Sequence, residues 1–527
     1  MHAEPRQFAH REILVIIGGL LTGMALAGLD STIVATSLPT IVGELGGLDH
    51  ISWVVTAYLL AETVTVPLYG KLSDLFGRPA LFRIAIVIFV AGSMLCGLAQ
   101  NLPMLVLFRG IQGLGAGGLI SMTFAIMGDV IPPRERGRYT GYLGSVFAVT
   151  SVVGPLLGGF LTDHVSWRWI FYVNVPVGAV ALVVTAKALR LPKPERVPGR
   201  RIDFLGAALL VVGVAAVLLG LEWGGTEHPW GSPLILALLA GGSTTVVAFI
   251  AWERRVEDPI LPLRLFRNDI VSVAGAMAFL AGVTMYGGII YLPLFLQVVK
   301  GVSASSSGLL LVPLMVGVLC AAIPVGRLIT RTGRYKFTGP VGFGSLMVSG
   351  GLLALTMHVS TPLPVTFGLM AAFGLGVGTL SPPLTLAVQN AVERSDLGAA
   401  TATNMFLRNL GGSVGVAVFG SVFAGRIGEQ LVARLPSEAV AEVGGDVTGL
   451  LREPSAIAGL PGPVADAIRG ATANSLQVVF LGVFVAAIIG LVVSLRLREI
   501  PLRSAADFAG QRRIDGPEAE ILEATPV

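Results

Sequence analysis

Three ionisable side chains stand within otherwise apolar stretches of this sequence. They are Asp30, Glu62 and Arg109. If those stretches cross a bilayer, a charge at its centre costs about 2.5–3.5 kcal/mol on insertion scales, so such groups normally face a cavity or pair. A desolvated carboxyl binds a proton more readily, whereas a nearby guanidinium favours the ionised form. Competition among a proton, an arginine and a cationic ligand for one carboxylate is the minimal machinery for exchanging protons against a cargo.

A structural interpretation stays open beside the chemical one. Asp30 and Arg109 could form a fixed pair that never titrates, and Glu62 could be a solvated cavity residue without a role. At 1.5 Å of rise per helical residue, Glu62 lies about 16 Å from the start of its apolar run, and Arg109 roughly 10 Å from the start of its own. With Asp30 in the outer half of the first run, we expect the three residues to line one central, outward-biased cavity.

Composition indicates the elements that hold these residues. The chain has 527 residues, of which 54% are hydrophobic and 13% charged, and its mean hydropathy is +0.79. A soluble domain carries about 25% charged residues, so we expect lipid to be the solvent. The 68 glycines suit close helix packing in lipid. Cys96 and Cys320 stand in apolar runs and are interpreted as small buried hydrophobes, not as disulfide or metal ligands.

Fourteen apolar runs are long enough to span a bilayer as helices, which takes about 20 residues. They lie near residues 13–38, 51–70, 81–100, 103–127, 139–161, 168–189, 203–222, 233–252, 270–298, 305–328, 337–357, 363–388, 398–424 and 475–496. We therefore predict an all-α polytopic membrane protein. Its parts are an N-terminal six-helix half (13–189), a linker with two extra transmembrane helices (190–269), a C-terminal six-helix half (270–496) with an external loop (425–474), and a cytoplasmic tail (497–527).

The basic residues predict the orientation. If the N-terminus is inside, most of the 36 Lys and Arg fall in cytoplasmic segments, as the positive-inside rule expects. We therefore expect a multi-pass protein of the plasma membrane with both termini cytoplasmic and an uncleaved first helix. The net charge of +4 follows from the same bias and does not indicate nucleic acid as a partner.

One motif occurs twice. Gly70, Gly77 and Arg78 follow the second run with the same spacing as Gly326, Gly333 and Arg334 after the tenth. Transporters built from two parallel halves leave this kind of faint symmetry.

The first copy carries charges that can change partners. Asp74 and Arg78 stand in it, and Asp129 at the inner end of the fourth run is placed to receive Arg78. Its glycines permit a tight turn. Thr330 stands where Asp74 stands in the first copy, so the second copy cannot make the same pair. A merely structural turn is the alternative for both copies.

The fifth run contains Gly154 and Pro155. Proline removes a helical hydrogen bond and glycine softens the neighbouring turn. The pair therefore predicts either a bend that seals the two halves against proton leak or simple close packing.

Five motifs occur in a characteristic order. They are LDSTIVATSLPTI (29–41), GKLSDLFGR (70–78), RGIQGLGAG (109–117), GSVFAVTSVVGPLLGG (144–159) and WRWIFYVNVPVG (167–178). Together with fourteen runs, they make the sequence resemble the major facilitator superfamily, specifically its fourteen-helix drug/proton antiporters. The resemblance covers essentially the whole chain.

The resemblance implies a function. It ties Asp30 and Arg109 to proton coupling, the 70–78 loop to a gate on the cytoplasmic side, and the 154–159 motif to antiport. Pro79 replaces a second basic residue that is usual in the gate motif. The expected protein is a secondary active exporter of small amphipathic, cationic or antibiotic-like compounds, working by alternating access and driven by the proton gradient without a bound cofactor.

Other classes of function find less support. The sequence has no G-x-x-x-x-G-K-[ST] phosphate loop, no His/Cys cluster for a metal and no nucleophile with a base in order, so we expect neither an enzyme nor an ATP-driven pump. The expected partners are a small-molecule substrate, protons and the lipid bilayer, with the chain acting as a monomer. Two alternatives remain: a dedicated exporter of one endogenous metabolite or lipid, and a non-transporting membrane receptor.

Overall fold

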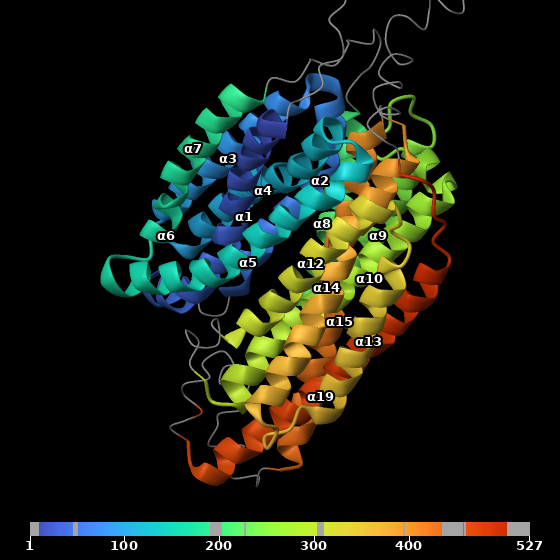
Figure 1. Ribbon diagram of the computed structural model, residues 1–527. Helices are drawn as coiled ribbons and strands as arrows, with labels where there is room; N and C mark the ends of the chain where they lie inside the picture. Colours follow the sequence, from blue (N-terminus) through green and yellow to red (C-terminus); the bar gives the residue numbers. More distant parts are fainter. Residues whose placement is uncertain are drawn as a thin grey trace, which may run out of the picture.

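Long helices make up this computed structural model (Figure 1). The structure describes residues 10–45, 51–189, 203–225, 228–302, 310–393, 396–434, 457 and 460–502. Within these ranges there is no β-strand, only an isolated bridge between Gly224 and His228. The predicted all-α class is therefore confirmed.

The helices fall into three groups along the chain. The N-terminal half contains α1 (His10–Leu45), α2 (Ile51–Phe76), α3 (Arg78–Gly97), α4 (Leu102–Val130), α5 (Pro133–His164), α6 (Trp169–Tyr172) and α7 (Asn174–Ala188). The inserted pair is α8 (Phe204–Trp223) and α9 (Pro233–Glu253), followed by the short 3₁₀ helix η2 (Leu263–Arg267). The C-terminal half contains α10 (Asp269–Leu294), the π-helical turn η3 (Phe295–Val299), α12 (Val312–Thr332), α13 (Thr338–Thr356), α14 (Leu363–Ala391), α15 (Leu397–Val432) and α19 (Gly462–Leu495).

Thirteen of the described helical segments are long and apolar enough to cross a membrane. The remaining predicted span is α2, a 26-residue helix in which Glu62 and several hydroxyl side chains lower the hydropathy. Helix α2 is nevertheless long enough to span a membrane, which agrees with the fourteen predicted spans.

The two halves repeat one packing pattern. In the N-terminal half α1 packs on α5 and α7, and α4 packs on α2 and α3. In the C-terminal half the equivalent helices do the same: α10 packs on α15 and α19, and α14 on α12 and α13. Between the halves, α2 packs on α15 and α5 on α12, so the second helix of each half meets the fifth helix of the other. This is the symmetry that a parallel repeat requires.

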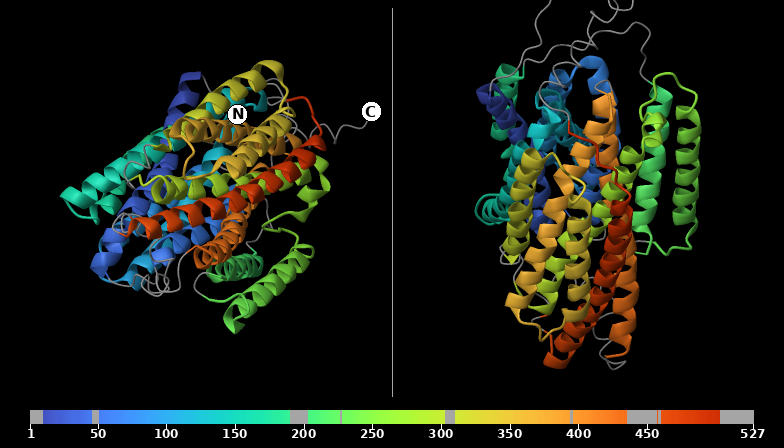
Figure 2. Two further views of the ribbon diagram at one scale, coloured as in Figure 1. Left: turned by 90° about the horizontal axis from the view of Figure 1, so that it is seen from below. Right: turned by 45° about the vertical axis from the view of Figure 1, so that its right-hand side comes forward.

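The inserted pair lies beside the bundle, as the second view in Figure 2 shows. Helix α9 packs on α8, and α8 packs on both α2 and α15 at the seam between the halves. Trp53 of α2 stacks on Trp223 of α8 with ring centroids 4.9 Å apart. The hydroxyl of Thr56 donates to Glu222 at 3.2 Å. Helix α8 therefore contacts both halves.

Helices extend into both ends of the predicted external loop 425–474. Helix α15 runs to Val432 and α19 begins at Gly462, so the stretch PVADAIRG forms the first turns of α19. Once a helix is nucleated, adding residues with good helix propensity costs little, and the two extensions pack together through a 3.2 Å hydrogen bond from Asn474 to Gln430. The basic cluster 190–201, residues 435–456 and most of the predicted tail (503–527) lie outside the described residues.

Close approach of α2 and α4 depends on a glycine. A Cβ placed at Gly113 would collide with the backbone carbonyl of Tyr58 and with Ala61, whereas one at Gly110, one turn earlier on α4, meets open space. Small residues at such crossings replace the hydrophobic drive that lipid does not provide.

We expect Gly113→Ala to destabilise the protein by about 1–3 kcal/mol through overpacking, while Gly110→Ala stays neutral or stabilises slightly, because alanine is the better helix former by about 1 kcal/mol. The measurement is the temperature at which half of the detergent-purified protein is lost from its gel-filtration peak. Equal midpoints for the two variants would contradict this packing.

Candidate functional site

The buried carboxylate of Asp30 is the centre of a polar network inside the N-terminal half. Arg109 donates from Nη1 to Asp30 Oδ2 at 2.5 Å. Gln112 Nε2 and Asn174 Nδ2 donate to Asp30 Oδ1 at 2.7 and 2.9 Å. Asp30 is 0% and Arg109 1% exposed. Three helices, α1, α4 and α7, thus contribute to one ion pair and its hydrogen bonds.

A second layer of contacts holds these donors. Arg109 also donates from Nε to the carbonyl of Val54 at 3.3 Å and from Nη1 to Gln112 at 2.8 Å, and its guanidinium lies 4.1 Å from the centroid of the Tyr58 ring. Stacking on an aromatic face stabilises a desolvated cation. Asn174 additionally donates to Ser93 Oγ on α3 at 3.0 Å. The network therefore links α1, α2, α3, α4 and α7.

This arrangement corrects one expectation. Asp30, Glu62 and Arg109 were expected to line one cavity, but Asp30 and Arg109 are enclosed within the N-terminal half in this conformation. Glu62 alone keeps part of its surface accessible. The mutual attraction of a buried pair with this many hydrogen bonds offsets the desolvation cost that an isolated charge would carry uncompensated.

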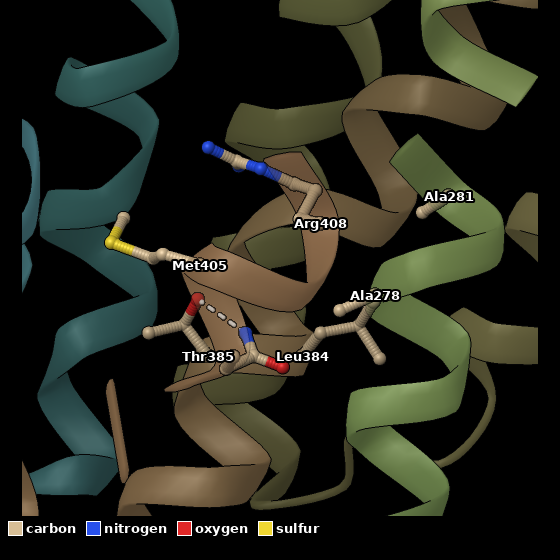
Figure 3. Close-up of a pocket in the computed structure, with 7 residues that line it drawn as sticks. Ala278, Ala281, Leu384, Thr385, Met405 and Arg408 are labelled. Atoms are coloured by element: carbon tan, nitrogen blue, oxygen red, sulfur yellow. Dashed lines mark hydrogen bonds between the residues drawn. The ribbon is translucent and has the colours of Figure 1, made fainter. Parts of the chain in front are cut away.

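Glu62 faces the other half of the protein. The charges of Arg408 on α15 and of Arg109 both act on its carboxyl group. Arg408 lines a small pocket with residues of α10 and α14, and Figure 3 shows its side chain reaching away from α15. The structure places Arg408 inside the protein, where its charge acts on Glu62 across the seam.

The 70–78 segment contacts the other half at one end of the bundle, which we call the Asp74 end. Arg78 forms ion pairs with Asp129 at 2.6 Å and with Asp74 at 3.1 Å, so the structure contains the pair predicted between Arg78 and the end of α4. Asp74 also accepts a hydrogen bond from the backbone N–H of Ala399 in the first turn of α15. A carboxylate at a helix N-terminus meets both an unsatisfied donor and the positive end of the helix dipole.

The glycines of the repeated motif have the conformations that the motif predicts. Gly77 and Gly333 have φ angles of 89° and 71°, a region open to glycine but costly for other residues. Gly70 lies where α2 meets α15: an added Cβ there would press on Ala402 and, at 3.1 Å, on the carbonyl oxygen of Gly398. Both copies therefore turn alike, and Gly70 brings α2 onto the other half.

The contacts of Arg136 were not predicted from the sequence, in which this residue counted only among the basic residues that indicate the orientation. It is 1% exposed and donates to Gln389 of α14 at 2.8 Å, to the carbonyl of Ile131 at 2.7 Å and to the carbonyl of Gly128. Gln389 in turn donates to the carbonyl of Phe124 at 3.1 Å. These bonds join the start of α5 and the end of α4 to the C-terminal half, again at the Asp74 end.

Gly154 and Pro155 lie inside α5, which continues to His164. A Cβ at Gly154 would collide with Thr32 of α1, and the Thr32 hydroxyl donates to the carbonyl of Thr150 at 3.0 Å. Gly154 thus serves close packing of α5 on α1 within the N-terminal half. Whether this part of α5 also seals the halves against protons stays a prediction.

The fold and these motifs agree with the comparisons. A family model described as Major Facilitator Superfamily matches residues 20–416. The chain belongs to the major facilitator superfamily. Among its relatives, an uncharacterised MFS-type transporter of Mycobacterium tuberculosis is 40% identical over 516 residues, covering 97% of this chain and 74% of the relative. A multidrug transporter of Bacillus subtilis is 37% identical over 422 residues, covering 80% of this chain and 77% of the relative.

Solved structures of the superfamily share the fold. A proton:xylose symporter superposes with a TM-score of 0.60 at 12% identity, covering 96% of this chain and 100% of the symporter. At this identity the likeness establishes only the fold. Family membership and the efflux-type relatives make the protein a membrane transporter and not an enzyme.

We expect Arg109→Gln to destabilise the protein by about 3–5 kcal/mol, because it leaves the Asp30 carboxylate buried without its cation. The double variant Asp30→Asn/Arg109→Gln should recover a large part of this loss. Thermal midpoints of the detergent-purified variants give the comparison. The control is Arg426→Gln, which breaks the exposed 3.0 Å pair with Glu429 and should change stability by less than about 1 kcal/mol.

The double variant decides the outcome. A double variant no more stable than Arg109→Gln would mean that the two charges do not depend on each other.

Proposed function

We propose that this transporter is a proton-coupled exporter of small amphipathic molecules, working by alternating access between its two halves. The observation that carries the proposal is the pairing state of the carboxylates in the membrane. Asp30 is locked to Arg109 inside one half, whereas Glu62 lies at the seam between the halves and belongs to no ion pair among the described residues. The similarity to multidrug transporters supports efflux as the direction of transport.

The proposed cycle uses the two carboxylates differently. A cationic substrate competes with protons for Glu62 at the seam. Protonation of Asp30 weakens its bond to Arg109, which frees the guanidinium to bind other groups and changes the field at Glu62. A proton taken up from outside thereby expels the cargo and allows the empty carrier to return. The charges of Arg109 and Asp30 both act on Glu62, which supplies the coupling that this cycle needs.

The proposal includes an orientation. The Asp74 end faces the cytoplasm, both termini lie on that side, and the protein works as a monomer in the plasma membrane. The contacts of Asp74, Arg78 and Arg136 across or beside the seam close the cytoplasmic side while the protein faces outward. Opening inward requires these contacts to break, so the 70–78 segment with Asp129 acts as the gate.

Transport in proteoliposomes tests the coupling. With a lumen more acidic than the bath, wild-type protein should accumulate a lipophilic dye such as rhodamine 123, and a protonophore should abolish accumulation. Asp30→Asn should lose nearly all gradient-driven uptake yet retain dye-for-dye counterflow, because only the proton step is removed. Glu62→Gln should lose both activities. The control is Asp466→Asn, which removes an exposed carboxylate on α19. Dye uptake that persists in the presence of the protonophore would contradict the antiport proposal.

Thiol labelling tests the gate and the orientation together. In a Cys96→Ser/Cys320→Ser background, Thr401→Cys places a thiol at a position that is 0% exposed at the Asp74 end. Adding Arg78→Gln should raise its labelling by a membrane-impermeant maleimide severalfold in inside-out vesicles, and Arg83→Gln on the exposed face of α3 should not. Labelling that occurs in intact cells instead would contradict the proposed orientation.

A further inference from the structure

Residues 254–268 join the inserted pair, which lies beside the bundle in Figure 2, to the first helix of the C-terminal half. The short helix η2 is the only regular element within this segment, yet Ile260, Leu261 and Leu265 are only 4%, 7% and 6% exposed. Connecting segments normally run over the surface of a protein. This one, which we call the strap, is instead anchored in the interior by apolar side chains.

The first part of the strap is held by the inserted pair and by α2. Glu253, the last residue of α9, is 3% exposed and accepts hydrogen bonds from the backbone N–H groups of Ile260 at 3.1 Å and Leu261 at 3.3 Å. Asp258 forms an ion pair with Lys71 of α2 at 3.6 Å. Ile260 and Leu261 belong to a buried cluster made mainly of residues from the N-terminal half and the inserted pair. The first part of the strap is therefore fixed to that side of the protein.

The second part of the strap is held by the C-terminal half. Arg264 forms an ion pair at 2.8 Å with Asp396, the residue directly before α15. Asn268 donates from Nδ2 to the carbonyl of Ala391 at the end of α14 at 3.0 Å. Leu265 belongs to the buried cluster of this half. The strap thus crosses from one half to the other at the Asp74 end, beside the start of α15.

The two sets of anchors lie close together along the chain. Leu261 and Leu265 are four residues apart, and an extended chain covers at most about 3.3–3.6 Å per residue, so their Cα atoms can separate by no more than about 14 Å. A wider separation requires one of the two leucines to leave its buried cluster, which exposes apolar surface to water. The strap therefore resists a wide separation of the halves at this end.

We propose that residues 254–268 limit how far the Asp74 end opens, with the inserted pair as their anchor on one side. The inference rests on the proposed alternating access and gives α8 and α9 a part in it. Trp252 near the end of α9 donates from Nε1 to the carboxylate of Asp203, directly before α8, at 3.0 Å. This bond joins the two inserted helices at the end where the strap begins, so the pair resists a pull on the strap as one unit.

Lengthening the strap tests this role. The insertion of Gly-Gly-Ser-Gly-Gly-Ser between Leu261 and Pro262 leaves the anchors on both sides in place and adds a flexible stretch whose ends are about 13 Å apart on average. The matched control is the same insertion between Thr226 and Glu227, in the connection of α8 to α9 at the opposite end of the inserted pair. Gel filtration verifies that each full-length variant is folded.

Spin labels report the separation of the halves. They are attached through Arg83→Cys on α3 and Arg334→Cys after α12, two exposed positions near the Asp74 end, in a Cys96→Ser/Cys320→Ser background. Double electron–electron resonance then gives the distances between the labels, with the protein in nanodiscs at constant pH and without a gradient.

The insertion in the strap should raise the population of long distances severalfold, because the halves can then separate while both leucines stay buried. The control insertion should leave the distances unchanged. Distances that stay the same after the strap is lengthened, or that change equally with the control insertion, would overturn the proposal.

A double variant tests the strap without changing its length. Asp258→Asn with Arg264→Gln removes the ion pair on each side of the crossing but keeps the buried leucines. Because each of these pairs is partly exposed to solvent, the ratio of long to short distances should rise by only about twofold to fivefold. The control is Glu257→Gln with Arg267→Gln, which alters exposed neighbours in the strap. An equal rise in both double variants would contradict the assignment to these two pairs.

The outcomes separate this inference from the proposed function, because distances measured without a gradient do not depend on proton coupling. Gradient-driven dye uptake by wild-type protein, combined with distances that the strap insertion does not change, would overturn the strap and leave the exporter proposal intact. A strap insertion that lengthens the distances, combined with gradient-independent uptake, would overturn only the proton coupling.

Discussion

The ion pair between Asp30 and Arg109 constrains the whole N-terminal half, because a bilayer offers neither charge another partner. Their 2.5 Å contact requires α1 and α4 to keep one register, and the donors from Gln112 and Asn174 extend that requirement to α7. In hydrocarbon each unsatisfied polar group costs several kcal/mol. The helices are thus fixed by polar contacts at their centre, while the lipid-facing apolar side chains confer little preference for one neighbour over another.

The charges at the seam stand under a different constraint. Glu62 and Arg408 belong to different halves, so an ion pair between them could form only when the halves come together. A fixed pair is suited to holding one half rigid, and an incomplete pair is suited to sensing what lies between two halves that move. In the proposed cycle this difference assigns the proton step to the enclosed pair and cargo binding to the seam, even though both sites lie close enough to influence each other.

The parts of the structure that the sequence predicts are those set by local properties. Hydrophobic length placed the helices, and the Gly70/Gly77 and Gly326/Gly333 repeat predicted the two-halved design. Helices α15 and α19 extend beyond the predicted runs 398–424 and 475–496, because the added turns are amphipathic and leave no apolar signal. Arg78 and Asp129 were paired correctly since both lie at ends of neighbouring helices. The partners of Asp30 beyond Arg109 were not predicted, nor was the bond from Arg136 to Gln389, because these partners lie 82, 144 and 253 residues away and are chosen by tertiary packing.

The repeat is symmetric in backbone but asymmetric in charge, and this asymmetry bears on how the halves would move. Asp74 of the first copy reaches the N-terminus of α15 and ties it to Arg78 and Asp129. Its counterpart Thr330 instead donates to the carbonyl of Gly326 in its own helix at 2.9 Å, and on that side Arg136 binds neutral carbonyl and amide oxygens. Within the part of the chain that the structure describes, the α2–α15 seam is closed by the Asp74 carboxylate, whose contacts respond to a change of charge. In the proposed cycle, the ion pairs of this seam would respond to the proton step, while the α5–α12 seam would be the packed surface about which the halves turn.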